Sequence, residues 1–258
     1  MSWASRKQFK YISIILGILI LILFWIFYPI IFKKPTCFDG KMNNTETGID
    51  CGGTCSRICD VDANLPVVVW SRAFPVTANI YNLAAYVENQ NRDAAVEKVD
   101  YEFLIYDTNN KLIGTKKGST FIPPNQPFVI FEPRFNSGEM QVKSVSFEFT
   151  SPFVWQKKEP TLTILPITVE DITLDNNFNL PSLTAKIKND SIHDIPSFSA
   201  VAILYDINHN VINVSKTEKD GVTSNASLPV SFTWPEALSG APVKNDILIQ
   251  INPFTVSF

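Results

Sequence analysis

The chain begins with one long apolar run and continues with short apolar segments of a different period. Residues 11–32 carry no charge, and about 20 apolar residues are enough to cross a bilayer as a helix. Beyond residue 60, β-branched and aromatic residues come in short runs separated by Asn, Asp, Pro and Gly, which is typical of strands and turns. The pattern therefore predicts a transmembrane helix followed by a mainly β protein.

The alternation is clearest near residue 100. Val99, Tyr101, Phe103 and Ile105 alternate with more polar residues, and this period of two predicts a strand with one buried face. In the first half of the β region, the predicted strands are residues 67–70, 78–87, 99–106, 111–114, 128–131 and 142–150.

The second half of the β region repeats the first. The sequence Val87-Glu88-Asn89 is echoed by Ile187-Lys188-Asn189, Ile105-Tyr106-Asp107 by Leu204-Tyr205-Asp206, and Phe131-Glu132-Pro133 by Thr233-Trp234-Pro235. A unit of about 100 residues is the usual size of an immunoglobulin-like sandwich. We therefore expect two tandem sandwiches, residues 61–156 and 157–258, with a hinge at residues 156–160. A single large sandwich is the alternative.

Polar residues at the predicted strand ends point to turns. Asp107 and Asp206 each follow a Tyr and precede polar residues, and Asp side chains at such positions bond their own backbone. We expect Asn89 and Asn189 to do the same at the ends of earlier strands.

At residues 105–107 and 204–206 the repeats resemble small extracytoplasmic β-sandwiches of the FxLYD-like group, in which a strand ends in aliphatic-Tyr-Asp. The resemblance implies a binding role without catalysis. In the second repeat, Ala200 and Ala202 stand where the first repeat has large residues, so the face that this strand buries stays open.

The apolar run has the flanks of a membrane anchor. Trp3 precedes it and Trp25, Phe27 and Tyr28 lie near its end, as in an aromatic belt. A cleaved signal peptide has a shorter core of about 7–15 residues and small residues at the cut site, whereas Phe32-Lys33-Lys34-Pro35 follows here. The basic residues favour a cytoplasmic N-terminus at residues 1–10. A buried core helix is the alternative.

All four cysteines, Cys37, Cys51, Cys55 and Cys59, fall within residues 33–60. This segment has too few apolar residues for a core, and closely spaced cysteines suit an oxidising space outside the cytoplasm. We expect two disulfides, for which three pairings are possible, and residues 33–258 to be extracytoplasmic. Zinc on the four cysteines is the alternative if the topology is inverted.

The cysteine segment also carries oxygen-bearing side chains at Asp39, Asn43, Glu46 and Asp50. Such side chains suit calcium, which takes six to eight oxygen ligands, although their spacing is not that of an EF-hand. The segment resembles a motif of bacterial surface proteins, C-x-D-G-x-x-N-x-x-E-T-G-x-D-C-G-G-x-C. The resemblance implies a calcium-stabilised stalk with these four residues as ligands. The alternative is a disulfide knot whose acids are only solvated.

Composition and charge exclude several classes of protein. The net charge is −3 and the three charges before residue 11 are positive, so removing them leaves −6, which argues against a nucleic-acid partner. Neither the Walker, HExxH nor GxSxG motif occurs, and His193 and His209 lie in polar turns. Adjacent Glu170 and Asp171 are expected on opposite faces of a strand, which makes a poor glycosidase pair. No enzyme and no small-molecule substrate is indicated.

We therefore expect a non-catalytic, single-pass surface protein, anchored in the membrane by residues 11–32, whose sandwiches bind or brace a protein partner. The alternative is an accessory subunit of a membrane or envelope complex. Phe153, Trp155 and Phe258 are candidates for an exposed contact patch or for core positions.

Overall fold

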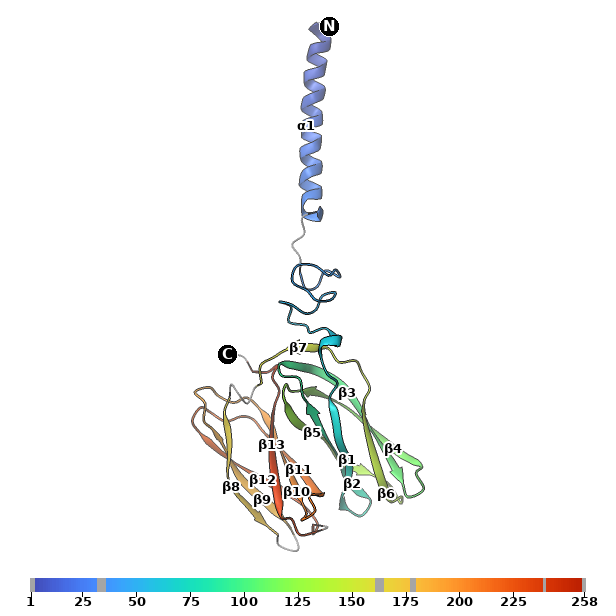
Figure 1. Cartoon of the computed structure of the whole chain (residues 1–258), viewed down its shortest axis with the longest axis vertical. Helices are drawn as coiled ribbons and strands as arrows, with labels where there is room; N and C mark the ends of the chain where they lie inside the picture. Colours follow the sequence, from blue (N-terminus) through green and yellow to red (C-terminus); the bar gives the residue numbers. More distant parts are fainter. Residues whose placement is uncertain (1–2, 32–35, 161–164, 177–179, 239, 257–258) are drawn as a thin grey trace. The chain divides into compact units, whose positions relative to one another are not determined.

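The computed structural model describes residues 3–31, 36–160, 165–176, 180–238 and 240–256. The chain divides into two compact units, Met1–Cys55 and Ser56–Phe258. The described part of the first contains the helix α1 (Trp3–Ile31), and that of the second contains a short 3-10 helix, η1 (Asp60–Asp62), and thirteen strands (Figure 1). The prediction of a mainly β protein with one N-terminal apolar helix is confirmed.

The helix α1 is long and apolar enough to cross a membrane. Its segment Gln8–Tyr28 has 21 residues with a mean hydropathy of 2.6, and at 1.5 Å per residue it extends about 31 Å, close to the bilayer core of about 30 Å. None of this segment is buried inside the structure, so α1 is not the core helix that the alternative required. Of the predicted span 11–32, residue 32 lies outside the described residues.

The strands of the second unit pair antiparallel throughout. They are β1 (Val67–Thr77), β2 (Ile80–Asn89), β3 (Ala94–Asp107), β4 (Leu112–Ile122), β5 (Gln126–Asn136), β6 (Val142–Phe149), β7 (Trp155–Lys157), β8 (Ile167–Asp175), β9 (Ser182–Asn189), β10 (Phe198–Tyr205), β11 (Val211–Lys219), β12 (Ser227–Thr233) and β13 (Lys244–Ile251).

The strand order repeats along the chain. Sheets β1-β2-β5 and β4-β3-β6 form a first sandwich, and β8-β9-β12 and β11-β10-β13 form a second with the same order. The short strand β7 adds to β3 in the first sandwich. Each of β1–β6 thus has a counterpart in β8–β13, as the repeated sequence segments suggest.

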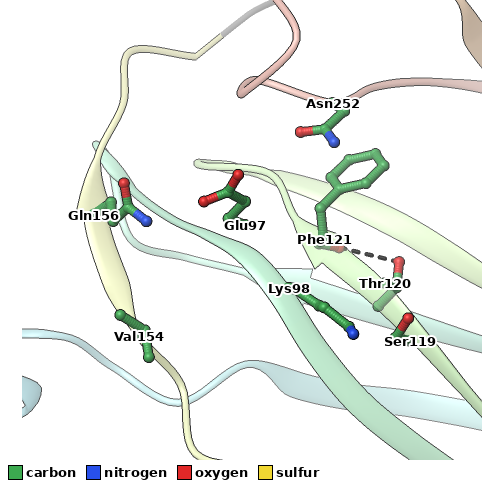
Figure 2. A pocket seen from close by; sticks show the side chains of 8 residues that line it. All are labelled: Glu97, Lys98, Ser119, Thr120, Phe121, Val154, Gln156 and Asn252. Carbon is green, nitrogen blue, oxygen red and sulfur yellow. Dashed lines mark hydrogen bonds between the residues drawn. The ribbon is translucent and has the colours of Figure 1, made fainter.

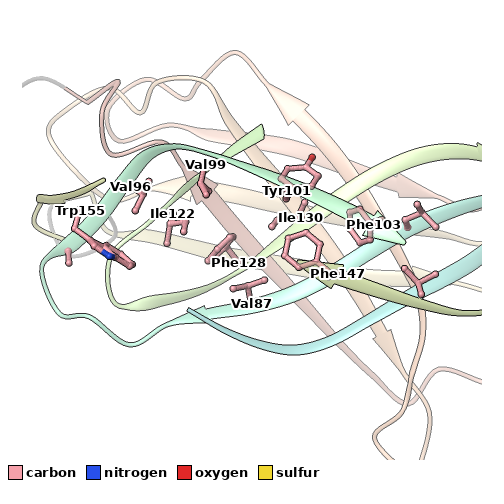
Figure 3. Packing of buried hydrophobic residues seen from close by; sticks show 14 of the residues in the cluster. Val87, Val96, Val99, Tyr101, Phe103, Ile122, Phe128, Ile130, Phe147 and Trp155 are labelled. Atoms are coloured by element: carbon pink, nitrogen blue, oxygen red, sulfur yellow. The ribbon is translucent and has the colours of Figure 1, made fainter. Parts of the chain in front are cut away.

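The first sandwich encloses an aromatic-rich core (Figure 3). Val99, Tyr101, Phe103 and Ile105 all point into it, which confirms the predicted alternation. The rings of Phe103 and Phe147 lie 4.9 Å apart in an edge-to-face arrangement, a geometry that aromatic pairs favour.

The candidate patch residues belong mainly to this core. Trp155 is only 1% exposed, and Phe153 packs against the core from its edge. The two rings stack at 5.5 Å. Phe258 lies outside the described residues.

The strand β10 buries both of its faces. The sequence left open which face of this strand is buried. Ala200 and Ala202 face the core of the second sandwich, whereas Val201 and Ile203 on the opposite face pack against the first sandwich. Small residues suffice on the inner face because Phe198 and Phe232 fill that core.

The apolar cluster between the two sandwiches is called the seam here. Its buried members are Phe74, Ala84, Val129, Val201, Ile203, Val211 and Val214. Hydrogen bonds cross beside it: Arg72 Nη1 donates to the Val211 carbonyl at 3.0 Å, and Gln250 Nε2 donates to the Val129 carbonyl at 3.1 Å. The two sandwiches are therefore packed on each other.

The segment expected to form a hinge, residues 156–160, is largely held by the first sandwich. Gln156 and Lys157 belong to β7 and pair with β3, and the Lys158 N–H donates to the Asp93 carbonyl at 2.7 Å. Charged side chains at a strand edge can face solvent while the backbone pairs, as the side chain of Lys157 does. The predicted boundary at residue 156 therefore falls inside β7.

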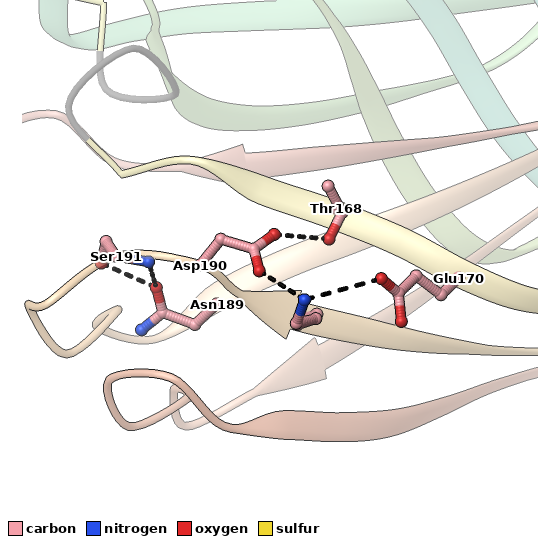
Figure 4. A network of polar contacts seen from close by, with 6 residues as sticks. Thr168, Glu170, Asn189, Asp190 and Ser191 are labelled. Atoms are coloured by element: carbon pink, nitrogen blue, oxygen red, sulfur yellow. Dashed lines mark hydrogen bonds and ion pairs between the residues drawn. The ribbon is translucent and has the colours of Figure 1, made fainter.

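Buried Asn189 joins two loops of the second sandwich. It is 0% exposed, and its Nδ2 donates to the carbonyl oxygens of His193, Val222 and Thr223 at 2.7, 3.2 and 3.1 Å. Its Oδ1 accepts from the N–H and hydroxyl of Ser191 (Figure 4). The bond to Ser191, two residues away, is the one that the sequence predicts. The bonds to Val222 and Thr223, more than 30 residues away, hold the β11–β12 loop.

Asn89 does the same in the first sandwich. Its Nδ2 donates to the carbonyl oxygens of Ala94 and Pro123, and its Oδ1 accepts from the Asn91 N–H. The two asparagines are thus equivalent loop anchors in the two repeats.

The Tyr-Asp turns also form as predicted. Oδ1 of Asp107 and of Asp206 each accepts the N–H groups two and four residues later. The backbone and side-chain amides of Asn210 hold the pKa of Asp206 below its usual value.

Glycine at position 118 leaves room for a contact between the side chains of Tyr101 and Glu132. The Tyr101 hydroxyl donates to Glu132 Oε1 at 2.7 Å, directly beside Gly118, and Lys116 lies 3.5 Å from the same carboxylate. Burial, together with this hydrogen bond, raises the pKa of Tyr101 above its usual value. A Cβ on Gly118 would overlap both the Tyr101 hydroxyl and Glu132.

We expect Gly118→Ala to lower the free energy of unfolding by about 1–3 kcal/mol, because the added methyl group overpacks the site. Urea unfolding of the variant and the parent measures the change. The control is Gly240→Ala, whose Cβ would meet only Ile212 Cγ2 at 3.8 Å. Equal losses in both variants would contradict the role of Gly118.

Candidate functional site

The cysteine module, residues 36–59, is held by disulfides. Cys37 is bonded to Cys55 with 5.7 Å between their Cα atoms, Cys51 and Cys59 are also disulfide-bonded, and no cysteine is free. The prediction of two disulfides is confirmed. Zinc needs thiolate ligands, so the oxidised cysteines contradict the zinc alternative.

The four predicted calcium ligands all take part in hydrogen bonds within the module. Asp39 Oδ2 accepts from Asn43 Nδ2 at 2.9 Å, and Glu46 Oε2 accepts from the Asn43 N–H at 3.0 Å. Asp50 Oδ1 accepts from the N–H groups of Asp39 and Gly40, both at 3.0 Å. These residues are thus linked largely by hydrogen bonds to backbone N–H groups. The side-chain amide of Asn43 lowers the pKa of Asp39.

The carboxylates of Asp39, Glu46 and Asp50 are not gathered into one group of metal ligands. Among the described residues, the one group of three acidic, cysteine or histidine ligand atoms within 4.8 Å is Cys37, Glu46 and Cys55, and two of its members form a disulfide. Asn43 Oδ1 is buried with no hydrogen-bond partner in the described structure, and Glu46 is 8% exposed. The fit to calcium is incomplete, and calcium binding stays a prediction.

Asp50→Ala tests whether backbone bonding or calcium orders the module. We expect faster hydrogen exchange at the Asp39 and Gly40 amides because both lose their acceptor. In the parent, protection without calcium and no gain at about 1 mM calcium, a concentration that fills extracellular sites, would show that backbone bonding orders the module by itself. The control is Asp60→Ala, which removes an exposed carboxylate after the module. Protection that appears in the parent only with calcium would contradict this view and support the calcium site.

The two histidines occupy turns. His209 has a positive φ of 61° in the β10–β11 turn, where its N–H donates to the Asp206 carbonyl at 3.0 Å. The carbonyl of His193 accepts from Asn189. Both positions agree with the polar turns seen in the sequence.

Glu170 and Asp171 do not lie on opposite faces as expected. Asp171 has a φ of 52° at a register shift between Glu170 and Thr173. A bulge of this kind reorients a side chain, and the two acids pair with Lys188 and Lys186, respectively. Those lysines are two apart on β9 and so share one face.

The ion pairs on this face are linked through Lys188, which pairs with Glu170 at 3.9 Å (Figure 4). Lys188 also lies 2.7 Å from Asp190, whose carboxylate accepts from the Thr168 hydroxyl. The lysine and the hydroxyl lower the pKa of Asp190. Glu170 and Asp171 of β8 are thus engaged with the neighbouring strand β9.

Two adjoining hollows lie where the sandwiches meet, and together they are called the seam groove here. The first has a volume of about 640 Å³ and the second about 360 Å³, and both are lined by Phe121 and Asn252. The first is further lined by Glu97, Lys98, Ser119, Thr120, Val154 and Gln156 (Figure 2). The second is further lined by Ser197, Phe198, Ser199, Lys216, Glu218, Lys219, Asp220, Gln250 and Thr255.

The sequence contains no signal for the seam groove. Phe121 lies near the end of β4, Gln156 lies in β7 and Asn252 follows β13, so the residues are far apart in the chain. Only the packing of the sandwiches brings them together, and no local pattern marks such positions.

Comparison with known proteins assigns no family. No family model matches the chain, and no curated protein matches it. Among solved structures, the chain is similar to a transglutaminase from red sea bream at 10% identity and a TM-score of 0.22. The match covers 72% of this chain but 29% of the transglutaminase, so the chain spans less than a third of that enzyme. At this TM-score the likeness carries no argument about function.

Proposed function

We propose that this chain is a non-catalytic protein anchored in a membrane by α1, which carries a packed pair of β-sandwiches on the extracytoplasmic side to bind or brace a partner. The observation that carries the proposal is an apolar helix of membrane-spanning length followed at once by a fully oxidised cysteine module. Disulfides persist in oxidising spaces, which supports an outside location for residues 33–258.

The charges near the helix support the same orientation. Arg6, Lys7 and Lys10 precede the apolar segment, and Lys33 and Lys34 follow it. An excess of basic residues marks the cytoplasmic side, so residues 1–10 form a cytoplasmic tail.

The seam supports a presenting or bracing role. Apolar side chains and two hydrogen bonds join the sandwiches. A force that acts on one sandwich, or a partner that binds it, therefore also affects the other. Loops and sheet edges on such a scaffold are the usual places for contacts with partners.

Alkaline extraction and protease protection of sealed membranes test the proposal. We expect the full-length chain, with α1 retained, to stay in the membrane at high pH. Protease added to the extracytoplasmic side should digest residues 33–258, and peptide mapping without reductant should find all four cysteines oxidised. A mature chain that lacks α1 or is released at high pH, digestion only from the cytoplasmic side, or free thiols would overturn the proposal.

A further inference from the structure

The seam groove combines the Phe121 ring with many neutral polar groups. Figure 2 shows the Phe121 ring pointing toward the Asn252 side chain at the border of the two hollows. Ser119 and Thr120 on β4 and Gln156 on β7 line the first hollow. Hydroxyl and carboxamide groups both donate and accept hydrogen bonds, which matches a ligand rich in hydroxyls.

The ionised groups of the seam groove balance. Its lining holds three lysines, Lys98, Lys216 and Lys219, and three acids, Glu97, Glu218 and Asp220. Lys216 lies 2.8 Å from Glu218, so part of this charge is already neutralised. A polyanion needs an excess of basic residues, and a polycation needs the reverse, so neither is matched here.

The dimensions of the two adjoining hollows suit an elongated ligand. The larger hollow alone falls within the range of about 300–1,000 Å³ of ligand pockets, and the smaller continues past Phe121 and Asn252. An elongated ligand can contact both hollows and lay one apolar face on the ring between them. Sugar rings have such a face of C–H groups and an edge of hydroxyls.

We propose that the seam groove binds a neutral oligosaccharide, with Phe121 stacking on one sugar ring and the amide and hydroxyl side chains bonding its hydroxyls. The inference rests on the proposed function, since a glycan ligand gives the extracytoplasmic sandwiches something to bind. The groove exists only while the sandwiches stay packed, so the seam also supports the site.

The test is titration calorimetry of the full chain in phosphatidylcholine nanodiscs, which avoids sugar-headed detergents. The probes are cellohexaose, chitohexaose, mannohexaose and maltohexaose. We expect one or more to bind with a Kd on the order of 1 mM or lower, and binding to change little with salt because the ligand is uncharged.

Phe121→Ala is expected to weaken that binding at least about tenfold. Its matched control is Phe38→Ala, which removes a ring that is 86% exposed outside the groove and should leave the Kd unchanged. Because Phe121→Ala can also disturb folding, Ser119→Trp provides a second variant: it fills the first hollow from an exposed position and should also abolish binding.

Three results would overturn the proposal: no binding by any of the four probes, binding unaffected by both groove variants, or binding of sulfated glycans alone with strong salt dependence. None of these results bears on membrane insertion. Membrane extraction and protease protection therefore judge the anchored-protein proposal separately.

Discussion

Asn189→Ala is expected to lower the free energy of unfolding by about 3–5 kcal/mol, because it removes five hydrogen bonds of a buried amide at about 0.5–1.5 kcal/mol each. Three carbonyl oxygens lose the Nδ2 donor, and the Ser191 N–H and hydroxyl lose the Oδ1 acceptor. Chemical denaturation of the full chain measures the loss.

Two further alanine variants serve as comparisons for Asn189→Ala. Asn89→Ala is expected to cost nearly as much, because Asn89 anchors the equivalent loops of the first sandwich. Asn208→Ala, at an exposed turn position, should change stability by about 0.5 kcal/mol or less. If Asn189→Ala behaves like Asn208→Ala, the anchor role is wrong.

Asn189→Asp adds a test with a definite pH dependence. A buried carboxylate facing three carbonyl oxygens is destabilised in its charged form, so its folded pKa rises above the unfolded value of about 3.9. The carboxyl then binds its proton more tightly in the folded state. Stability relative to the parent should be greatest below about pH 4 and fall as the pH rises through the folded pKa. A variant that gains relative stability toward neutral pH would contradict the buried site.

Ile203→Asp is expected to lower the free energy of unfolding by about 4 kcal/mol or more and to uncouple the two sandwiches. Ile203 is 0% exposed within the seam, and a buried carboxylate without a partner is costly. The control is Ile207→Asp in the turn between β10 and β11, where Ile207 is 77% exposed. Little change in the free energy of unfolding is expected for this variant.

Three tryptophans report on separate parts of the unit. Trp155 lies in the first core, Trp234 in the second, and Trp70 packs at the seam, stacked on Tyr86 at 5.7 Å. In single-tryptophan versions, Ile203→Asp should shift the Trp234 transition to lower denaturant than the Trp155 transition, and Trp70 should follow Trp155 because both lie in strands of the first sandwich. Coincident transitions at the parent midpoint would show that Ile203 does not couple the sandwiches.

Local chemistry explains what the sequence determined by itself. The length and apolarity of α1 depend only on consecutive residues. The disulfide module follows from cysteine spacing and the shortage of apolar residues. Asp107 and Asp206 bond N–H groups within four residues, and the alternation from Val99 to Ile105 needs only the strand period. Each of these features is complete within a short stretch of chain.

Contacts between distant segments decided the rest. The second face of β10 is buried because the first sandwich covers Val201 and Ile203, and a strand covered on both faces loses the alternation that reveals its orientation. The bulge at Asp171 and the backbone bonding of Asp50 depend on partners that spacing does not reveal. The seam groove joins β4, β7 and the residues after β13, so only tertiary packing creates it.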